Sequence, residues 1–427
     1  MSAELLARYK GSLPSFVKPM YSEPIEIDHG EGGYVYDANG VRYLDFFGGV
    51  LTTSVGHNNP DVTAAVQEQA AKVIHSSTLY LNKTMIDLAE KITSLSGIPD
   101  ARVYFTPSGT EANDAALMLA TSYRKSNQIL AMRNSYHGRS HSTQAITSHA
   151  TWAATSNSGL KVTFVQGPYK LRSPFSSLED DAYTAACVDD LSQLLAMTSA
   201  GDVAAMIAEP IQGVGGFATP PDGFFGAMNK ELENRGILFI ADEVQTGWGR
   251  TGEHFWGYQA HGVVPDMLTF AKGVGNGMAL AGVVARAEIM DTINVLNFST
   301  FGGTPIACAG GLATINHILD NDLQANAKAM GDRFRTGLEA IAAETPWIAE
   351  VRGRGLMQAF ETVAPDSTEP SPQHALDTLE ATKANNLLVG KGGLYGNVIR
   401  MAPMMNVTAD EIDEGLEALS VAIRSVN

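Results

Sequence analysis

The stretch ILFIADEVQTGWGRTG (237–252) opens with a continuous apolar run that ends on Asp242, and MLTFAKG (267–273) holds another that ends on Lys272. Such runs are typical of strands buried on both faces of a parallel sheet. Five similar runs lie between residues 101 and 286: ARVYFT (101–106), QILAMR (128–133), KVTFVQ (161–166), VAAMIAEP (203–210) and AGVVAR (281–286). Most are separated by helical or loop-like segments, which predicts an α/β fold with a mainly parallel seven-stranded sheet flanked by helices. The last two runs in chain order follow one another closely, which leaves an antiparallel pairing open.

The sequence on either side of these runs predicts two further parts. Residues 1–55 read as an N-terminal segment that packs with the small domain and holds a hairpin around Asn39-Gly40. Residues 56–310 form the large domain, which begins with helices between about 60 and 100. Residues 311–427 form a smaller α+β domain. The helices expected around it span roughly 305–345, 373–386 and a last segment with capping-box spacing at Thr408 and Glu411.

Composition excludes several classes of protein. The chain has 427 residues and a formal net charge of −17, with no basic footprint for nucleic acid. The chain has no run of about 18 apolar residues, so we expect no membrane span. The ten histidines show no paired metal spacing, so we expect no metal site. Two cysteines outside any CxxC motif, and an N-terminus without a signal-peptide core, favour the cytoplasm.

Asp242 and Lys272 together point to one chemistry. Alone, Asp242 could cap a helix or form a structural ion pair, and Lys272 could be an ordinary surface lysine. As a pair at the ends of two apolar strands, they supply an amine that can form a Schiff base and a carboxylate that can keep a pyridine nitrogen protonated. This combination is what pyridoxal 5'-phosphate (PLP) requires to act as an electron sink.

Three other motifs could complete such a site. FTPSGTEANDAALMLA (105–120) reads as a strand, a glycine turn and a helix, with Ser108 and Glu111 at capping-box spacing. The N–H groups of that helix start would suit a phosphate, although the motif is equally typical of a well-capped helix. Tyr136 could stack on a flat ring or be a half-buried core residue. Arg400 could bind a carboxylate in bidentate fashion or form an interdomain salt bridge.

The order of motifs resembles the class III aminotransferases of PLP fold type I. The motifs are SGTEAND, YHG, AEPIQG, ADEVQTGWGRTG, FAKGVGNG and TFGGTP, and the likeness runs from YLDFFGGV (43–50) to IRMAP (399–403). Within that family, HSSTLYLN, AEPIQGVGGF, HFWGYQAHGVVPD and NFSTFGGTPIACA are most similar to the mitochondrial-type alanine–glyoxylate aminotransferases.

The resemblance implies contacts with the cofactor. Lys272 would hold PLP as a Schiff base and carry a proton between the substrate Cα and the cofactor C4', while Asp242 would pair with the pyridine nitrogen. Val244 and Tyr136 would pack on the two ring faces, and Gln245 would reach the phenolic oxygen. The full set of implied cofactor-binding residues is Ser108, Gly109, Thr110, Tyr136, His137, Asp242, Val244, Gln245, Lys272 and Thr304.

The resemblance also implies a subunit arrangement and substrate contacts. Thr304 would bind the phosphate of a neighbouring subunit, so we expect a homodimer or a dimer of dimers with shared active sites. Arg400 would bind the substrate α-carboxylate, and Glu209 would neutralise that arginine when the substrate is uncharged there. Val214 stands where some 4-aminobutyrate-using relatives have Glu.

We therefore expect a PLP-dependent aminotransferase that moves an amino group from L-alanine or a β-amino acid to glyoxylate or pyruvate. Two alternatives keep the cofactor: an ω-amino acid aminotransferase that uses 2-oxoglutarate, and a racemase or decarboxylase of the same family. A non-catalytic scaffold on the same fold is a third alternative, which the presence of Lys272, Asp242 and Arg400 argues against.

Overall fold

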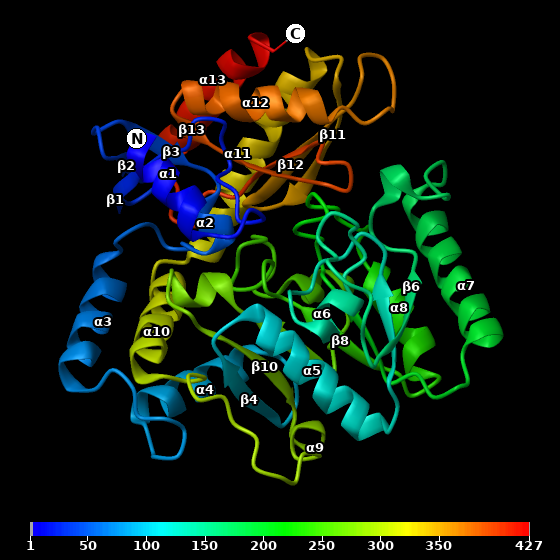
Figure 1. The fold of residues 1–427 in the computed structure, drawn as a ribbon. Coiled ribbons are helices and arrows are strands. Elements are labelled where there is room, and N and C mark those ends of the chain that lie inside the picture. The colour runs from blue at the N-terminus through cyan, green and yellow to red at the C-terminus, as the bar shows by residue number, and fades with distance from the viewer. Residues whose placement is uncertain (1–2, 427) are drawn as a thin grey trace.

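The computed structural model describes residues 3–426, and its largest feature is a seven-stranded sheet in the lower part of Figure 1. The strands lie in the order β4-β10-β9-β8-β7-β5-β6. Their bounds are β4 (Ala101–Thr106), β5 (Gln128–Met132), β6 (Lys161–Val165), β7 (Ala205–Ala208), β8 (Leu238–Asp242), β9 (Met267–Phe270) and β10 (Ala281–Arg286). These are the seven predicted apolar runs, so the predicted α/β class and strand number are confirmed.

One strand of this sheet runs against the others. β10 pairs antiparallel with both β9 and β4, whereas β5, β6, β7, β8 and β9 pair in parallel. β4 consequently points the same way as β9, and all strands except β10 end at one edge. Ligands of open α/β sheets bind beyond that edge. Asp242 is the last residue of β8 and lies beside Thr269 of β9, so the sheet delivers the predicted carboxylate to that edge.

Helices cover both faces of the sheet (Figure 1). Their bounds are α3 (Pro60–Lys72), α4 (Lys83–Leu95), α5 (Gly109–Arg124), α6 (His141–Ala145), α7 (Asp180–Thr198), α8 (Phe224–Glu233), α9 (Ala287–Met290) and α10 (Pro305–Asp320). Leu119 of α5 packs in a cluster with Ile240 of β8, while Met228 of α8 packs in another cluster with Phe239. Because neighbouring residues of a strand point to opposite faces, both faces of β8 are buried.

The single helix expected over roughly 305–345 is wrong. The chain forms two helices, α10 and α11 (Leu323–Ala343), which are separated by Asn321 and Asp322. Asp322 adopts a left-handed conformation with φ 47°, and α-helical hydrogen bonding cannot continue through it. Asn and Asp tolerate that conformation better than other side chains, so the break has a local cause that an apolar pattern does not reveal.

The C-terminal part forms a smaller antiparallel sheet covered by helices. The sheet order is β11-β12-β15-β14. The bounds are β11 (Ile348–Arg354), β12 (Met357–Thr362), β14 (Gly390–Gly392), β15 (Val398–Met401), α12 (Pro372–Ala384) and α13 (Ala409–Arg424). The capping box predicted at the start of α13 is present, with Thr408 and Glu411 each bonded to the other's backbone N–H.

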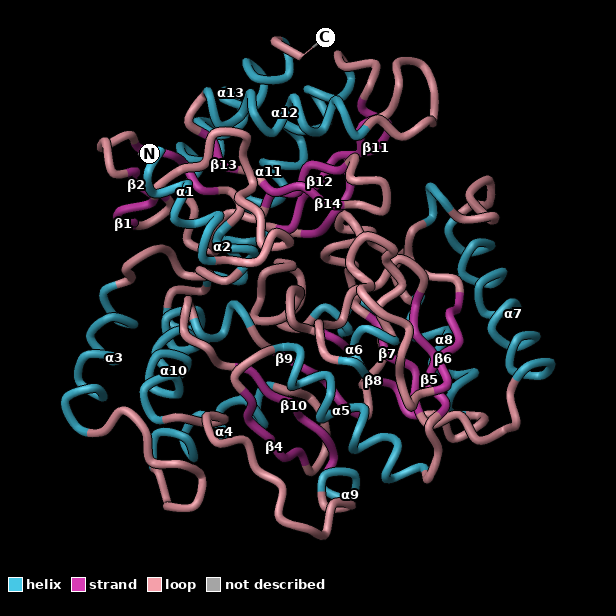
Figure 2. Tube along the Cα trace, viewed as in Figure 1, coloured by secondary structure: helices cyan, strands magenta, loops and turns pink. Residues whose placement is uncertain are grey.

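The N-terminal segment joins this smaller unit. Figure 2 shows its strands close to α12 and α13. Its elements are α1 (Ala3–Ser12), β1 (Ile27–Glu31), β2 (Tyr34–Asp37) and β3 (Arg42–Asp45), and the C-terminal strand β13 (Leu387–Leu388) completes their sheet. β2 and β3 form the predicted hairpin, and β3 pairs in parallel with β13 through Leu44 and Leu387. The division into three domains stays a prediction.

The remaining elements are short. They are α2 (Gly48–Leu51), η1 (Lys170–Arg172), η2 (Gly257–His261) and η3 (Lys272–Gly275). Between residues 3 and 426, no helix combines the length and apolar character that a membrane crossing requires. That same stretch contains no cluster of three His, Cys, Asp or Glu side chains suited to a metal ion.

Candidate active site

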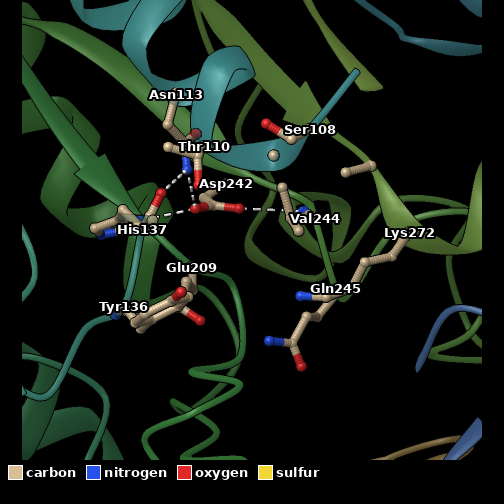
Figure 3. Close-up of a pocket in the computed structure, with 13 residues that line it drawn as sticks. Ser108, Thr110, Asn113, Tyr136, His137, Glu209, Asp242, Val244, Gln245 and Lys272 are labelled. Atoms are coloured by element: carbon tan, nitrogen blue, oxygen red, sulfur yellow. Dashed lines mark hydrogen bonds and ion pairs between the residues drawn. The ribbon is translucent and has the colours of Figure 1, made fainter. Parts of the chain in front are cut away.

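A pocket at the carboxyl edge of the large sheet collects most of the predicted site residues (Figure 3). Its empty space, part of which is open to solvent, is about 580 Å³. Ten of the twelve predicted residues line it: Ser108, Gly109, Thr110, Tyr136, His137, Glu209, Asp242, Val244, Gln245 and Lys272. Arg400 and Thr304 are not in its lining. The pocket therefore unites residues from five separate strand ends, although their roles stay predictions.

Asp242 is held by a buried network at the base of the pocket. Its Oδ2 accepts from Asn113 Nδ2 at 2.8 Å and lies 2.7 Å from His137 Nδ1. Its Oδ1 accepts from the Val244 N–H at 3.2 Å, and the Asn113 carbonyl accepts from Thr269 Oγ1 at 2.7 Å. This carboxylate is 4 % exposed, and the donors that face it satisfy its oxygens in the buried site. A protonated pyridine nitrogen would match it in charge.

Lys272 stands directly after β9, at the start of η3. Burial lowers the pKa of its amine from 10.5 to about 8, an effect opposed by the carboxylates of Asp242 and Glu209. Within the described chain, its amine forms no hydrogen bond or ion pair with a side chain. Lys272 also has φ 49°, and a non-glycine residue in that conformation is strained in a way that often marks functional sites. The amine is thus available to react with an aldehyde.

The start of α5 forms a cradle for an anion. Ser108 caps the helix, and its Oγ accepts from the Glu111 N–H at 3.2 Å. The reciprocal bond of the predicted capping box is missing, because the Glu111 carboxylate instead receives the Ser299 hydroxyl at 3.5 Å. A Cβ on Gly109 would lie 3.2 Å from Val244 Cγ2, so only glycine fits there without a shift of its neighbour. A helix start that lines a pocket favours a phosphate.

The middle of the pocket fits a flat ring. Val244 and Tyr136 are both half-buried there, and the Tyr136 ring meets the Trp152 ring edge-on with centroids 5.4 Å apart. The Gln245 side-chain carbonyl is buried and lacks a hydrogen-bond partner within residues 3–426. A buried polar atom without a partner is costly, which indicates a ligand atom at that position. The pocket thus fits PLP at its ring, its phosphate and its nitrogen.

Arg400 lies on β15 of the smaller sheet and is 4 % exposed. Its Nη1 donates to the Gly213 carbonyl at 2.9 Å and its Nη2 to the Lys391 carbonyl at 3.0 Å. Its Nε is buried and unpartnered within residues 3–426. Burial lowers the pKa of Arg400 to about 10, so the guanidinium stays charged near neutral pH. The centroids of the Phe47 and Phe217 rings lie 5.5 and 5.6 Å from its Cζ.

Glu209 lies between these parts of the site. Its carboxylate accepts from the Tyr136 N–H at 3.0 Å and from the Gly213 N–H at 2.8 Å, and burial raises its pKa. Across residues 3–426, no direct ion pair links Glu209 to Arg400. The backbone of Gly213 joins them instead, because its N–H donates to Glu209 and its carbonyl accepts from Arg400. Neutralisation of Arg400 by Glu209 stays a prediction.

Thr304 lies apart from the pocket. It precedes α10, and its hydroxyl donates to the Ile74 carbonyl at 3.0 Å and lies 3.3 Å from His75 Nδ1. Its predicted phosphate contact belongs to a second subunit and is therefore still a prediction.

Sequence reasoning missed several residues of the site. Asn113 stands inside the SGTEAND motif, four residues or one turn after Gly109, and that spacing could have placed it on the same helix face as the anion cradle. Phe217 and Phe47 contact Arg400 across the chain, and no local pattern reveals such contacts. The double glycine of FFGG is a signal for Phe47, because Gly48 and Gly49 both adopt positive φ in the turn beside it.

Comparison with known proteins agrees with this geometry. A family model described as aminotransferase class-III matches residues 17–423. The chain is 37 % identical to an alanine–glyoxylate aminotransferase 2 homologue, mitochondrial, of Arabidopsis thaliana, covering 98 % of this chain and 87 % of the relative. It is 34 % identical to the alanine–glyoxylate aminotransferase 2, mitochondrial, of Homo sapiens, covering 98 % and 86 %.

Solved structures extend the comparison. An (S)-enantioselective ω-transaminase from Thermomicrobium roseum superposes with a TM-score of 0.92 at 32 % identity, over 100 % of this chain and 99 % of the other. A PLP-bound amine transaminase from an uncultivated Pseudomonas species superposes with a TM-score of 0.91 at 29 % identity, over 98 % and 100 %. The fold is that of the PLP fold type I transaminases.

Proposed function

The chain belongs to the class-III aminotransferases, which use PLP, and from this premise we propose that it moves an amino group from L-alanine or a β-amino acid to glyoxylate or pyruvate. The observation that carries the proposal is the convergence of the buried Lys272 amine and the hydrogen-bonded Asp242 carboxylate on one pocket at the carboxyl edge of the sheet. The names of the Arabidopsis and human relatives support L-alanine and glyoxylate as the first substrates to test.

When bound, PLP supplies an electron sink for the electron pair released as the substrate Cα–H bond breaks. Asp242 holds the proton on the ring nitrogen, with its geometry set by Asn113 and His137. Lys272 would hold the cofactor through its amine, and the same amine would carry the proton from the substrate Cα to the cofactor C4'. A pKa lowered towards neutrality suits an amine for both directions of this transfer.

Arg400 binds the substrate carboxylate in this proposal. Two of its N–H groups bond to backbone carbonyls, and its Nε has no hydrogen-bond partner within residues 3–426. The neighbouring Phe47 and Phe217 rings exclude water, which strengthens a charge-assisted hydrogen bond.

We also propose a homodimer with shared active sites. Two neighbouring loops expose large apolar side chains, and the His75 and Phe301 rings, 5.2 Å apart, join the loops. The exposed residues are Ile74, Leu79, Tyr80, Leu81, Val295, Leu296 and Phe301. Apolar surface of this extent favours a partner. Thr304 stands between the loops, as a residue that contacts a phosphate of the neighbouring subunit would.

The double variant Leu81→Asp, Leu296→Asp tests this interface. It should have the mass of a monomer in light scattering and should retain PLP weakly, as measured by the absorbance of the bound cofactor. An unchanged mass would reject this interface.

A cytoplasmic location is part of the proposal. Its support is limited to the two cysteines, Cys187 and Cys308, which are both buried and unpaired.

Two other substrate classes have specific support. A 4-aminobutyrate aminotransferase of Mycobacterium leprae is 32 % identical over 98 % of this chain, and a leucine/methionine racemase of Thermococcus litoralis is 33 % identical over 99 %. Val214, in place of the glutamate of some 4-aminobutyrate-using relatives, weighs against the first.

The test is a panel of amino donors against glyoxylate, pyruvate and 2-oxoglutarate. Loss and return of the visible absorbance of the bound cofactor would follow each half-reaction. L-Alanine with glyoxylate should give the highest kcat/KM. A preference for 4-aminobutyrate with 2-oxoglutarate, or inversion of an amino acid without an oxo acid, would overturn the substrate assignment.

A further inference from the structure

The segment between β14 and β15 closes over Arg400. A Cβ atom on Gly392 would lie only 2.6 Å from Arg400 Nε, so this glycine lets the backbone approach the guanidinium. The Lys391 carbonyl accepts from Arg400, and the Gly393 N–H donates to the Val214 carbonyl at 2.9 Å. The position of the segment 391–396 therefore sets the position of the Lys391 carbonyl, which is one of the two carbonyl partners of Arg400.

One side chain from the large domain bonds to this segment. His149 is 2 % exposed, and its Nε2 lies 3.2 Å from the Gly393 carbonyl. Its Nδ1 lies 3.0 Å from Thr151 Oγ1, so a hydroxyl that donates to Nδ1 leaves the proton on Nε2, which donates to Gly393. Burial lowers the pKa of His149, and nearby Arg400 lowers it further, so the ring is neutral. Elsewhere in residues 3–426, no large-domain side chain hydrogen bonds to residues 392–396.

The turn that carries His149 also reaches the cofactor half of the pocket. The N–H groups of Trp152 and Ala153 both donate to the His149 carbonyl, at 2.8 and 2.9 Å. This turn presents the Trp152 ring to the Tyr136 ring. His149 is thus anchored in the large domain by its own backbone and reaches across to the small domain with its ring.

We propose that His149 is a positioning residue for the substrate carboxylate: it fixes the segment 391–396 against the large domain and so holds Arg400 between carbonyls from both domains. The proposal rests on the proposed role of Arg400. It assigns to His149 an effect on carboxylate binding and none on the reacting atoms, since His149 is not among the residues that line the pocket and its ring hydrogen bonds to Gly393 and Thr151.

The experiment measures carboxylate binding separately from chemistry, in the holoenzyme. Propanoate carries the carboxylate without an amine, so its inhibition constant against L-alanine reports on Arg400 alone. Methoxyamine attacks the bound cofactor and carries no carboxylate, so its rate reports on the cofactor end. The variants are His149→Leu, which removes the donor, and His149→Gln, which keeps one. His141→Leu is the matched control, because the exposed His141 ring has the Asn157 carbonyl as its one hydrogen-bond partner among residues 3–426.

His149→Leu should raise the propanoate inhibition constant and the KM for L-alanine about threefold to tenfold, the effect of losing one hydrogen bond. kcat and the methoxyamine rate should stay within about twofold. His149→Gln should recover most of the loss, and His141→Leu should change neither constant. Thr151→Val, which leaves the ring without its Nδ1 partner, should give a smaller change in the same direction.

Three results would overturn the inference. One is an unchanged propanoate constant in a folded His149→Leu enzyme. Another is a methoxyamine rate that falls by the same factor as propanoate binding weakens in His149→Leu, which would show a general structural role. The third, if His149→Leu does not fold, is normal propanoate binding in Thr151→Val together with no recovery in His149→Gln. Arg400→Gln separates this failure from that of the proposed function: if Arg400→Gln leaves propanoate binding intact, the role of Arg400 itself is wrong.

Discussion

The two ends of the active site are built in different ways. At the cofactor end, Asp242 is held by Asn113, His137 and the Val244 N–H, all within the large domain. At the proposed substrate end, Arg400 is held by one carbonyl from each domain, Gly213 and Lys391, and its Nε has no partner within residues 3–426.

This difference would let the choice of substrate change while the type of reaction stays the same. A network inside one domain keeps its geometry whatever the other domain does, which suits a carboxylate that must always face the same ring nitrogen. A site shared by two domains changes when either domain or its loops change, and relatives named for different substrates share one fold. The substrate end is therefore where selectivity would be adjusted.

Lys272 stands between the two ends, and its loss should have the largest effect. Lys272→Ala should lower the rate of amino transfer by about 10³-fold or more, because both the anchor and the proton carrier are removed. Single-turnover absorbance changes measure this rate, with circular dichroism as the control for folding. A rate near that of the wild type would mean that another group moves the proton.

The cofactor end should respond next. Asp242→Asn should lower kcat roughly 10²-fold with little change in KM, because a neutral amide cannot hold the ring-nitrogen proton. Asn113→Ala, which removes one donor to the carboxylate, should cost about tenfold. Steady-state kinetics with L-alanine would measure both. If Asp242→Asn raised KM and left kcat unchanged, the distinction between the two ends would be wrong.

The substrate end should show the opposite pattern. Arg400→Gln should raise the KM for carboxylate-bearing donors about 10- to 100-fold, the value of hydrogen bonds to a charged group. The methoxyamine rate should not change. A raised KM together with a lower methoxyamine rate would indicate that the small domain has moved. An unchanged KM would show that Arg400 does not bind the substrate.

The smallest effect concerns pH. Because burial lowers the pKa of Lys272 to about 8, its neutral fraction grows as pH rises through that value. The rate at which cofactor-free enzyme takes up PLP should rise about tenfold between about pH 7 and about pH 9 and then level off. Stopped-flow absorbance measures it. A rate that keeps rising to about pH 10.5 would indicate an unburied, ordinary lysine.

The sequence predicted the cofactor end better than the substrate end, for a physical reason. Asp242, Lys272 and Ser108 each follow an apolar strand, and strands in a parallel sheet end at one edge, so local patterns bring them together. The break at Asp322 was missed because a single left-handed residue interrupts a helix without changing its apolar period. The predicted capping box at Ser108 is only half formed because Glu111 turns to Ser299, a residue far away in sequence.

By itself, the sequence determined the α/β class, the seven strands and the family, since each rests on periodic or contiguous patterns. Only the tertiary structure decided how Arg400 is held: its Gly213 partner is 187 residues away, and His149 reaches Gly393 across 244 residues. Such contacts depend on how two domains pack, and no local pattern of apolar and polar residues encodes that packing. The class of reaction could therefore be predicted from the chain, whereas the contacts that hold Arg400 are set by the fold.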